Sequence, residues 1–277
     1  MRKPITVALL VILPLLLLGL TGVSQAQLVL YDDFSVKPIN PAKWFGSERQ
    51  FGPGAPDTET TRKIANGQIE IDLTTYGRAD SDTGFAGFSD SSLQVTNPAP
   101  IRTLQVDVTI KNVKVVGCAA NPTPTRSRAL VVGGFFNDGT SPAPGDRTGD
   151  IVAGMDSRRD SIFGDVILAF IARCTNALCT TSTSLTFAVF TATWTKGVPD
   201  TFRMQWLPSP INQFVFTLNP AEPNPETKTL SYTVSDSTPP VLDFKLLQDS
   251  NAVANCLSGP RTSATVKALF DNVMVNP

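Results

Sequence analysis

The chain has 277 residues, of which 42% are hydrophobic and 17% are charged, with 23 Lys and Arg against 24 Asp and Glu. Nucleic-acid binding rests on clustered basic side chains that neutralise phosphates, so this near-neutral chain without a basic block is not expected to bind nucleic acid. The absence of histidine excludes Ser-His-Asp and Cys-His catalysis, histidine-ligated zinc and imidazole acid–base chemistry. Any reaction must therefore use carboxylates, Tyr, Lys, Arg or a hard cation.

Residues 1–26 have the organisation of a secretory signal peptide. Two basic residues precede an apolar run from Ile5 to Leu20, and Ser24-Gln25-Ala26 places small residues where signal peptidase cleaves. The length of the apolar run leaves an uncleaved membrane anchor as the alternative. We expect cleavage, with no membrane association afterwards, and a secreted chain that is extracellular, or periplasmic if the source has an outer membrane. Residues 27–277 are then expected to form one domain.

The mature region has the pattern of an all-β protein. Short segments of alternating apolar residues recur between clusters of Gly, Pro, Asn and Asp, and no window has a long helical period. In one of them Ile69, Ile71 and Leu73 point to one face and Glu70 and Asp72 to the other. The predicted strands are Leu28–Phe34, Lys63–Thr74, Arg102–Val116, Ala129–Asn137, Asp150–Ser157, Val166–Cys174, Leu185–Thr193, Thr201–Trp206, Gln213–Leu218 and Val266–Val275. Two sheets that each bury one face predict an antiparallel β-sandwich of the jelly-roll type.

The four cysteines are interpreted as disulfides, because an exported chain meets an oxidising environment and their spacing fits no zinc pattern. Cys174 and Cys179 are close enough to close a short loop, CTNALC. The remaining pair would be Cys118 with Cys256. This is the favoured one of three possible connectivities.

Several segments resemble the concanavalin A-like lectin/glucanase superfamily. Tyr31-Asp32-Asp33-Phe34, followed by Asn40-Pro41-Ala42-Lys43-Trp44, is similar to its N-terminal entry, and Asn66-Gly67-Gln68-Ile69-Glu70-Ile71 to an early strand. Ala268-Leu269-Phe270-Asp271-Asn272-Val273-Met274-Val275 is similar to its closing strand. The resemblance implies a two-sheet jelly roll whose first and last strands lie side by side.

Glucanases of this superfamily carry a strand of the form E-x-D-x-x-E or E-x-D-x-E. Glu70 and Asp72 match its first two acidic positions, but Thr74 and Thr75 stand where the second Glu belongs. A retaining glycosidase needs two carboxyl groups, one of which donates a proton, and threonine cannot replace it. We therefore expect no catalytic residues, and interpret Glu70 and Asp72 as part of a polar outer face.

The resemblance also implies a structural calcium site between the terminal strands. Asp33 near the start and Asp271 near the end are the predicted ligands, since carboxylate and backbone oxygens suit Ca²⁺. The alternative is that both side chains only cap strand ends by bonding backbone amides.

Aromatic side chains are the candidate sugar platforms. Trp194, just before a Gly turn, is predicted to be exposed, and Tyr76 is the second candidate. Trp44 and Trp206 are interpreted as core residues. The acidic and basic residues from Asp156 to Asp160 are interpreted as a solvated turn.

Together these observations predict an exported, non-catalytic sandwich that binds carbohydrate in the manner of a lectin, with a polysaccharide or glycan as its partner. Two alternatives stay open. One is a structural component of a surface or matrix, and the other is a divergent glycoside hydrolase or polysaccharide lyase.

Overall fold

The computed structural model describes residues 27–51, 57–96, 101–136, 146–207, 212–233 and 241–276, so the expected signal peptide lies outside the described residues. These segments form two antiparallel sheets, of eight and seven strands. Sheet A has the order β13 (Glu226–Ser231), β12 (Gln213–Leu218), β11 (Pro199–Leu207), β6 (Thr103–Val116), β15 (Ser263–Asn276), β4 (Gln68–Tyr76) and β3 (Asp57–Ala65), and β1 (Val29–Asp32) also pairs with β15. Sheet B has the order β10 (Ser182–Val189), β9 (Gly164–Cys174), β8 (Ile151–Asp160), β7 (Arg126–Phe136), β14 (Val241–Ala254), β5 (Phe85–Val95) and β2 (Trp44–Phe51). The predicted two-sheet antiparallel sandwich is confirmed.

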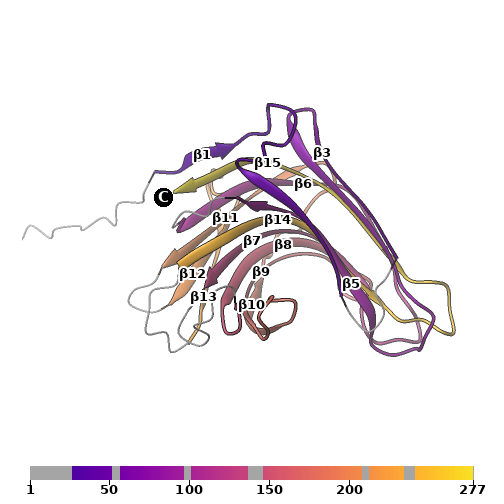
Figure 1. The fold of residues 1–277 in the computed structure, drawn as a ribbon. Coiled ribbons are helices and arrows are strands. Elements are labelled where there is room, and N and C mark those ends of the chain that lie inside the picture. The colour runs from indigo at the N-terminus through magenta and orange to yellow at the C-terminus, as the bar shows by residue number, and fades with distance from the viewer. Residues whose placement is uncertain are drawn as a thin grey trace, which may run out of the picture.

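The first and last strands of the described chain lie side by side. β1 runs antiparallel to β15, with Val29 opposite Val275 and Leu30 opposite Met274. Figure 1 shows β1 alongside β15 at the outer layer of the molecule. This is the adjacency that the resemblance implied.

The core lies between the sheets and is built by alternation. Ile69, Ile71 and Leu73 of β4 are fully buried and belong to one cluster with Val131 and Met155 of sheet B. Because side chains alternate across a strand, the residues between these point away from the core. Burial of each large aliphatic side chain contributes roughly 1.5–3 kcal/mol, so this cluster is the main source of stability.

The strands are bent into an arch. Figure 1 shows β14, β7, β8 and β9 on the inner side of β15 and β6, so sheet B lines the inside of the arch. We call the side of sheet B that points away from sheet A the concave face.

The segment predicted as one strand, Lys63–Thr74, is a hairpin. β3 ends at Ala65, which pairs with Gln68, the first residue of β4. Asn66 and Gly67 between them have φ of 53° and 76°. Asn-Gly with both residues at positive φ is the favoured two-residue hairpin turn, so the chain reverses here instead of continuing.

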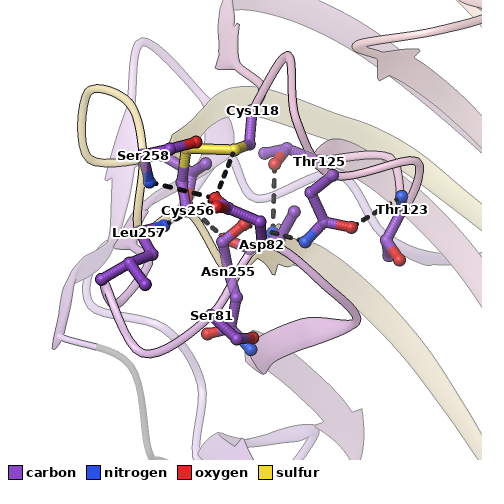
Figure 2. The surroundings of a disulfide bond; sticks show 12 residues. Ser81, Asp82, Cys118, Thr123, Thr125, Asn255, Cys256, Leu257 and Ser258 are labelled. Carbon is purple, nitrogen blue, oxygen red and sulfur yellow. Dashed lines mark hydrogen bonds between the residues drawn. A yellow bond between two sulfur atoms is a disulfide. The ribbon is translucent and has the colours of Figure 1, made fainter.

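Both favoured disulfides, Cys118–Cys256 and Cys174–Cys179, are present. Figure 2 shows the first of them beside Asp82, whose carboxylate accepts hydrogen bonds from the backbone amides of Leu257 and Ser258 at 2.9 and 3.1 Å. The amide of Ser258 is the main reason that the pKa of Asp82 is lowered. The bridge and this carboxylate therefore tie three loops together at one end of the sandwich.

In the part of the chain that the structure describes, no helix has the length and apolarity that crossing a membrane would need.

Candidate functional site

The concave face has a regular order that follows from strand register. Residues directly opposite one another across sheet B form rows perpendicular to the strands. One row, the aromatic row, contains Phe45, Gln94, Leu246, Val132, Gly154, Phe170 and Phe187. A second row, the charged row, lies four residues further along β8, which is about 13 Å by strand rise. It contains Arg49, Asp90, Ser250, Arg128 and Arg158. The sheet therefore presents an apolar end and a charged end on one surface.

The aromatic row contains a phenylalanine laid over a glycine. A Cβ added to Gly154 would come within 2.8 Å of the Phe170 ring. The ring therefore occupies the space that a side chain at position 154 would fill. Phe187 on the edge strand pairs with Phe170 and has 64% of its surface exposed. At the opposite edge of the sheet Phe45 is 46% exposed. Rings on a sheet face are suited to contact the apolar faces of a flat ligand.

In the charged row, two arginines are paired with aspartates. Arg158 donates two hydrogen bonds to Asp156, of 2.8 and 2.6 Å, and Asp156 is fully buried. Arg49 donates to Asp90 at 2.8 Å. These residues lie in strands, so the segment from Asp156 to Asp160, predicted as a solvated turn, is instead the end of β8. Paired arginines and aspartates of this kind hold the side chains of the face in place.

Arg126 and Arg128 of β7 point to the same face without such partners. Arg128 donates to the hydroxyl of Ser250 at 3.0 Å, and the Arg126 guanidinium lies 5.3 Å from the centre of the Phe85 ring. Burial, together with the nearby charge of Arg158, lowers the pKa of Arg128 to about 10. Burial and Arg158 lower the pKa of Arg126 as well. The concave face therefore holds positive charge that its own residues compensate incompletely.

Two carboxylates of this face, Asp156 and Asp160, already accept hydrogen bonds from neighbouring groups. Both oxygens of Asp156 accept from Arg158, and Asp160 accepts from the backbone amides of Ile162 and Phe163 at 2.8 and 3.2 Å. A glycosidase acid must donate a proton to the leaving oxygen. Asp156 and Asp160 would have to give up these partners to act in that way.

Of the two predicted sugar platforms, Trp194 is not at the surface. It is 7% exposed, packs in the main core, and donates from its indole nitrogen to the carbonyl of Arg158 at 3.0 Å. The Arg159 guanidinium lies 5.3 Å from the ring centre. The Gly turn that follows Trp194 suggested exposure, but the tryptophan folds back under β8. Its indole is part of the scaffold beneath the charged row.

Tyr76 is half-buried at the end of β4, on the outer face of sheet A. Arg261 lies 5.2 Å from the centre of its ring. The two predicted platforms are thus on different parts of the molecule and do not form one site.

Glu70 and Asp72 are also on the outer face of sheet A. Lys63 and Lys267 approach Glu70 at 3.1 and 3.2 Å, and Lys267 lies 3.5 Å from Asp72. Burial alone would raise the pKa of Glu70, but the two lysines outweigh it and lower the pKa. The pair is a charge network on the convex side, away from the concave face.

The two predicted calcium ligands, Asp33 and Asp271, come from segments that lie side by side in the fold. The pairing of β1 with β15 brings the residues after Asp32 near those before Val273. Asp33 accepts from the backbone amide of Ser35 at 3.1 Å. The Ser35 hydroxyl, followed by this amide, lowers the pKa of Asp33. Asp271 accepts from the Gln68 amide at 3.2 Å and from the backbone of Asn272 at 2.8 Å. Among the described residues, the one group of three acidic or sulfur ligands is Asp82 with the disulfide-bonded Cys118 and Cys256.

Sequence reasoning missed Phe170, Phe187, Arg126 and Arg128. A signal for the arginines was present, since Arg126 and Arg128 alternate with small residues ahead of a Val-rich strand core. The aromatic pair could not be found in this way, because its position over Gly154 depends on the register of three strands.

No family model matches the chain, and no curated protein matches it. Solved structures with a similar fold include the carbohydrate recognition domain of Emp46p in its potassium-bound form, with 12% identity, a TM-score of 0.38, and coverage of 78% of this chain and 88% of that one. A β-1,3-1,4-glucanase from a mouse hindgut metagenome has 12% identity, a TM-score of 0.44, and coverage of 87% and 97%. The Bacillus licheniformis β-glucanase has 10% identity, a TM-score of 0.44, and coverage of 91% and 98%.

Proposed function

We propose that the chain is an exported, non-catalytic sandwich that binds a glycan on the concave face of sheet B. The observation that carries this proposal is the aromatic row, in which Phe170 lies over Gly154 beside the exposed Phe187, on the same surface as ordered polar side chains. Export is supported by the signal-like N-terminus and by two disulfides, which persist in oxidising compartments.

The arrangement matches the general make-up of small-molecule sites, which combine apolar and aromatic contact area with a few placed polar groups. The fold itself does not decide between binding and catalysis, since one fold hosts many functions. Binding is favoured here because the carboxylates of the concave face already accept hydrogen bonds.

The test is a broad glycan array with the mature, folded protein, followed by titration of the best ligand. Phe187→Ala and Phe170→Ala should each weaken binding roughly tenfold or more, as truncation of an aromatic anchor does. Phe163→Ala is the matched control, because Phe163 is 74% exposed in the β8–β9 turn outside the row. Tyr76→Ala separates this proposal from the site predicted by sequence. Binding lost in Tyr76→Ala but kept in Phe187→Ala would place the site on sheet A.

A surface or matrix component remains the second candidate, supported by the exposed apolar residues of edge strand β10, Leu185, Phe187 and Val189. An edge strand with apolar side chains favours self-association. Concentration-dependent assembly in light scattering, with no glycan bound by the monomer, would favour this candidate.

A further inference from the structure

Arg126 and Arg128 are basic side chains of the concave face that lack an acidic partner. They are two residues apart on β7 and so point the same way. No carboxylate of the described residues lies within 4.0 Å of either guanidinium, and the Nε atom of each is buried without a hydrogen-bond partner. Both side chains are half-buried, and the charges of Asp156, Asp160 and Asp90 offset the effect of burial only in part. A desolvated guanidinium donor without a hydrogen-bond partner is costly, so such groups are normally paired or bind a ligand.

The other arginines around them have such partners. Arg49 has Asp90, Arg158 has Asp156, and Arg159 has Asp165 at 2.6 Å. Asp160, which faces Arg126 across the β7–β8 pair, bonds the backbone amides of the following turn. The concave cluster thus has four arginines, 49, 126, 128 and 158, against the three aspartates 90, 156 and 160, a difference of 4 − 3 = +1.

The neutral contacts of the two arginines leave donors free. Arg128 uses one terminal nitrogen on Ser250. Arg126 is stacked toward the face of the Phe85 ring, which engages the plane of its guanidinium and not the N–H groups at its edge. A guanidinium presents five donors in a fixed fork that fits a carboxylate or sulfate by two parallel bonds.

From this geometry we infer that Arg126 and Arg128 form a subsite for the acidic groups of the glycan, so that the ligand is an anionic polysaccharide carrying carboxylates or sulfates. The inference rests on the proposed function. A glycan is favoured over other polyanions because the aromatic row lies on the same face, about 13 Å along the strands, where its rings can contact other sugar units of the same glycan.

The experiment uses the mature protein and four probes: polygalacturonate for carboxylates, dextran sulfate for sulfates, unmodified dextran as neutral glycan, and single-stranded DNA as a polyanion without pyranose units. Arg128→Gln and Arg126→Gln should each weaken binding of the preferred acidic glycan roughly tenfold or more, since hydrogen bonds to charged groups are among the stronger ones. Arg203→Gln is the matched control, because Arg203 is on the outer face of sheet A, where it donates to Gln105 at 2.8 Å. The preferred probe identifies which acidic group is bound.

A readout that needs no variant is the melting temperature, which the preferred acidic glycan should raise and dextran should not. Equal loss of binding in Arg203→Gln, or equal binding of DNA and acidic glycan, would overturn the inference. Binding of neutral glycans alone, with Phe187→Ala weakened and Arg128→Gln unchanged, would overturn it while leaving the proposed function intact. No binding of any glycan would overturn both.

Discussion

Asn251 of β14 and Ser127 of β7 are joined by a hydrogen bond of 2.5 Å inside the sandwich, from the serine hydroxyl to the amide oxygen. The amide nitrogen of Asn251 crosses to the other sheet and donates to the carbonyl oxygens of Leu73 and Ala264 at 3.2 and 2.9 Å, and to the hydroxyl of Thr75 at 3.1 Å. One polar side chain therefore links four strands of two sheets in a position where an apolar residue would be expected.

Replacing this side chain should be costly. Asn251→Ala removes the partner of Ser127, of Thr75 and of two backbone carbonyls in a buried site, and each buried polar group left unsatisfied costs about 1–3 kcal/mol. We expect the free energy of unfolding to fall by about 2–4 kcal/mol in urea denaturation. Gln94→Ala, a half-buried position on the concave face, should change it by less than about 1 kcal/mol. Similar effects at both positions would show that the network is not a stabilising feature.

Asp249, two residues before Asn251, is fully buried in the same layer. Burial raises its pKa well above the usual value, and the charge of Asp72 adds to the rise. Neither carboxyl oxygen has a hydrogen-bond partner of normal geometry among the described residues, and the backbone amide of Ala268 offsets the effect only in part. Burial therefore favours the neutral form of this acid in the folded protein.

Stability should therefore depend on pH through Asp249. Because its folded pKa is above the unfolded value of 3.8, the stability linked to this acid is fully present below pH 3.8 and is lost as the pH rises through the folded pKa. Asp249→Asn should thus be more stable than the natural chain at pH 7, with the difference vanishing near pH 3.5. Urea denaturation at both pH values measures this, with exposed Asp80→Asn as the control. An advantage of Asp249→Asn that does not change with pH would contradict it.

The same buried polar layer explains why the sequence analysis missed β5 and β14, two of the strands absent from its prediction. β5 and β14 are adjacent strands inside sheet B, next to its edge strand β2, yet their inward positions include Ser89, Ser91, Asp249 and Asn251, so the alternation of apolar residues is broken. By contrast, Gln213–Leu218 was predicted with its observed bounds, because its inward residues are all apolar. Periodicity finds strands whose buried face is apolar, and fails where the partners of a buried polar residue come from the other sheet.

The candidate site was harder to predict than the fold for a related reason. The sandwich and both disulfides follow from local pattern and composition, and the adjacency of the first and last strands was implied by the resemblance. The concave face depends on register, since Phe170, Gly154 and Phe187 meet only when three strands are correctly aligned. The aromatic singled out from the sequence, Trp194, is next to a turn but packs inward.

The calcium site predicted at Asp33 and Asp271 remains a proposal. If both side chains bind Ca²⁺, excess calcium should raise the melting temperature relative to a chelator, because a ligand that binds only the folded state stabilises it. Asp271→Asn should remove this rise, and Asp80→Asn should keep it. Equal melting temperatures of the natural chain in calcium and chelator would leave both aspartates as caps of backbone amides.

The two disulfides should differ in their contribution to stability. Cys118–Cys256 closes a sequence separation of 138 residues and Cys174–Cys179 one of 5. In the chain-entropy account the stabilisation grows with the logarithm of the loop, to about 5 kcal/mol for the first bridge and about 2 kcal/mol for the second. The Cys118→Ala/Cys256→Ala pair should therefore lower the midpoint of urea denaturation well beyond the Cys174→Ala/Cys179→Ala pair, which serves as its matched control. Similar losses would mean that the loops beside Asp82 stay together without the bridge, held by the hydrogen bonds that this carboxylate accepts from Leu257 and Ser258.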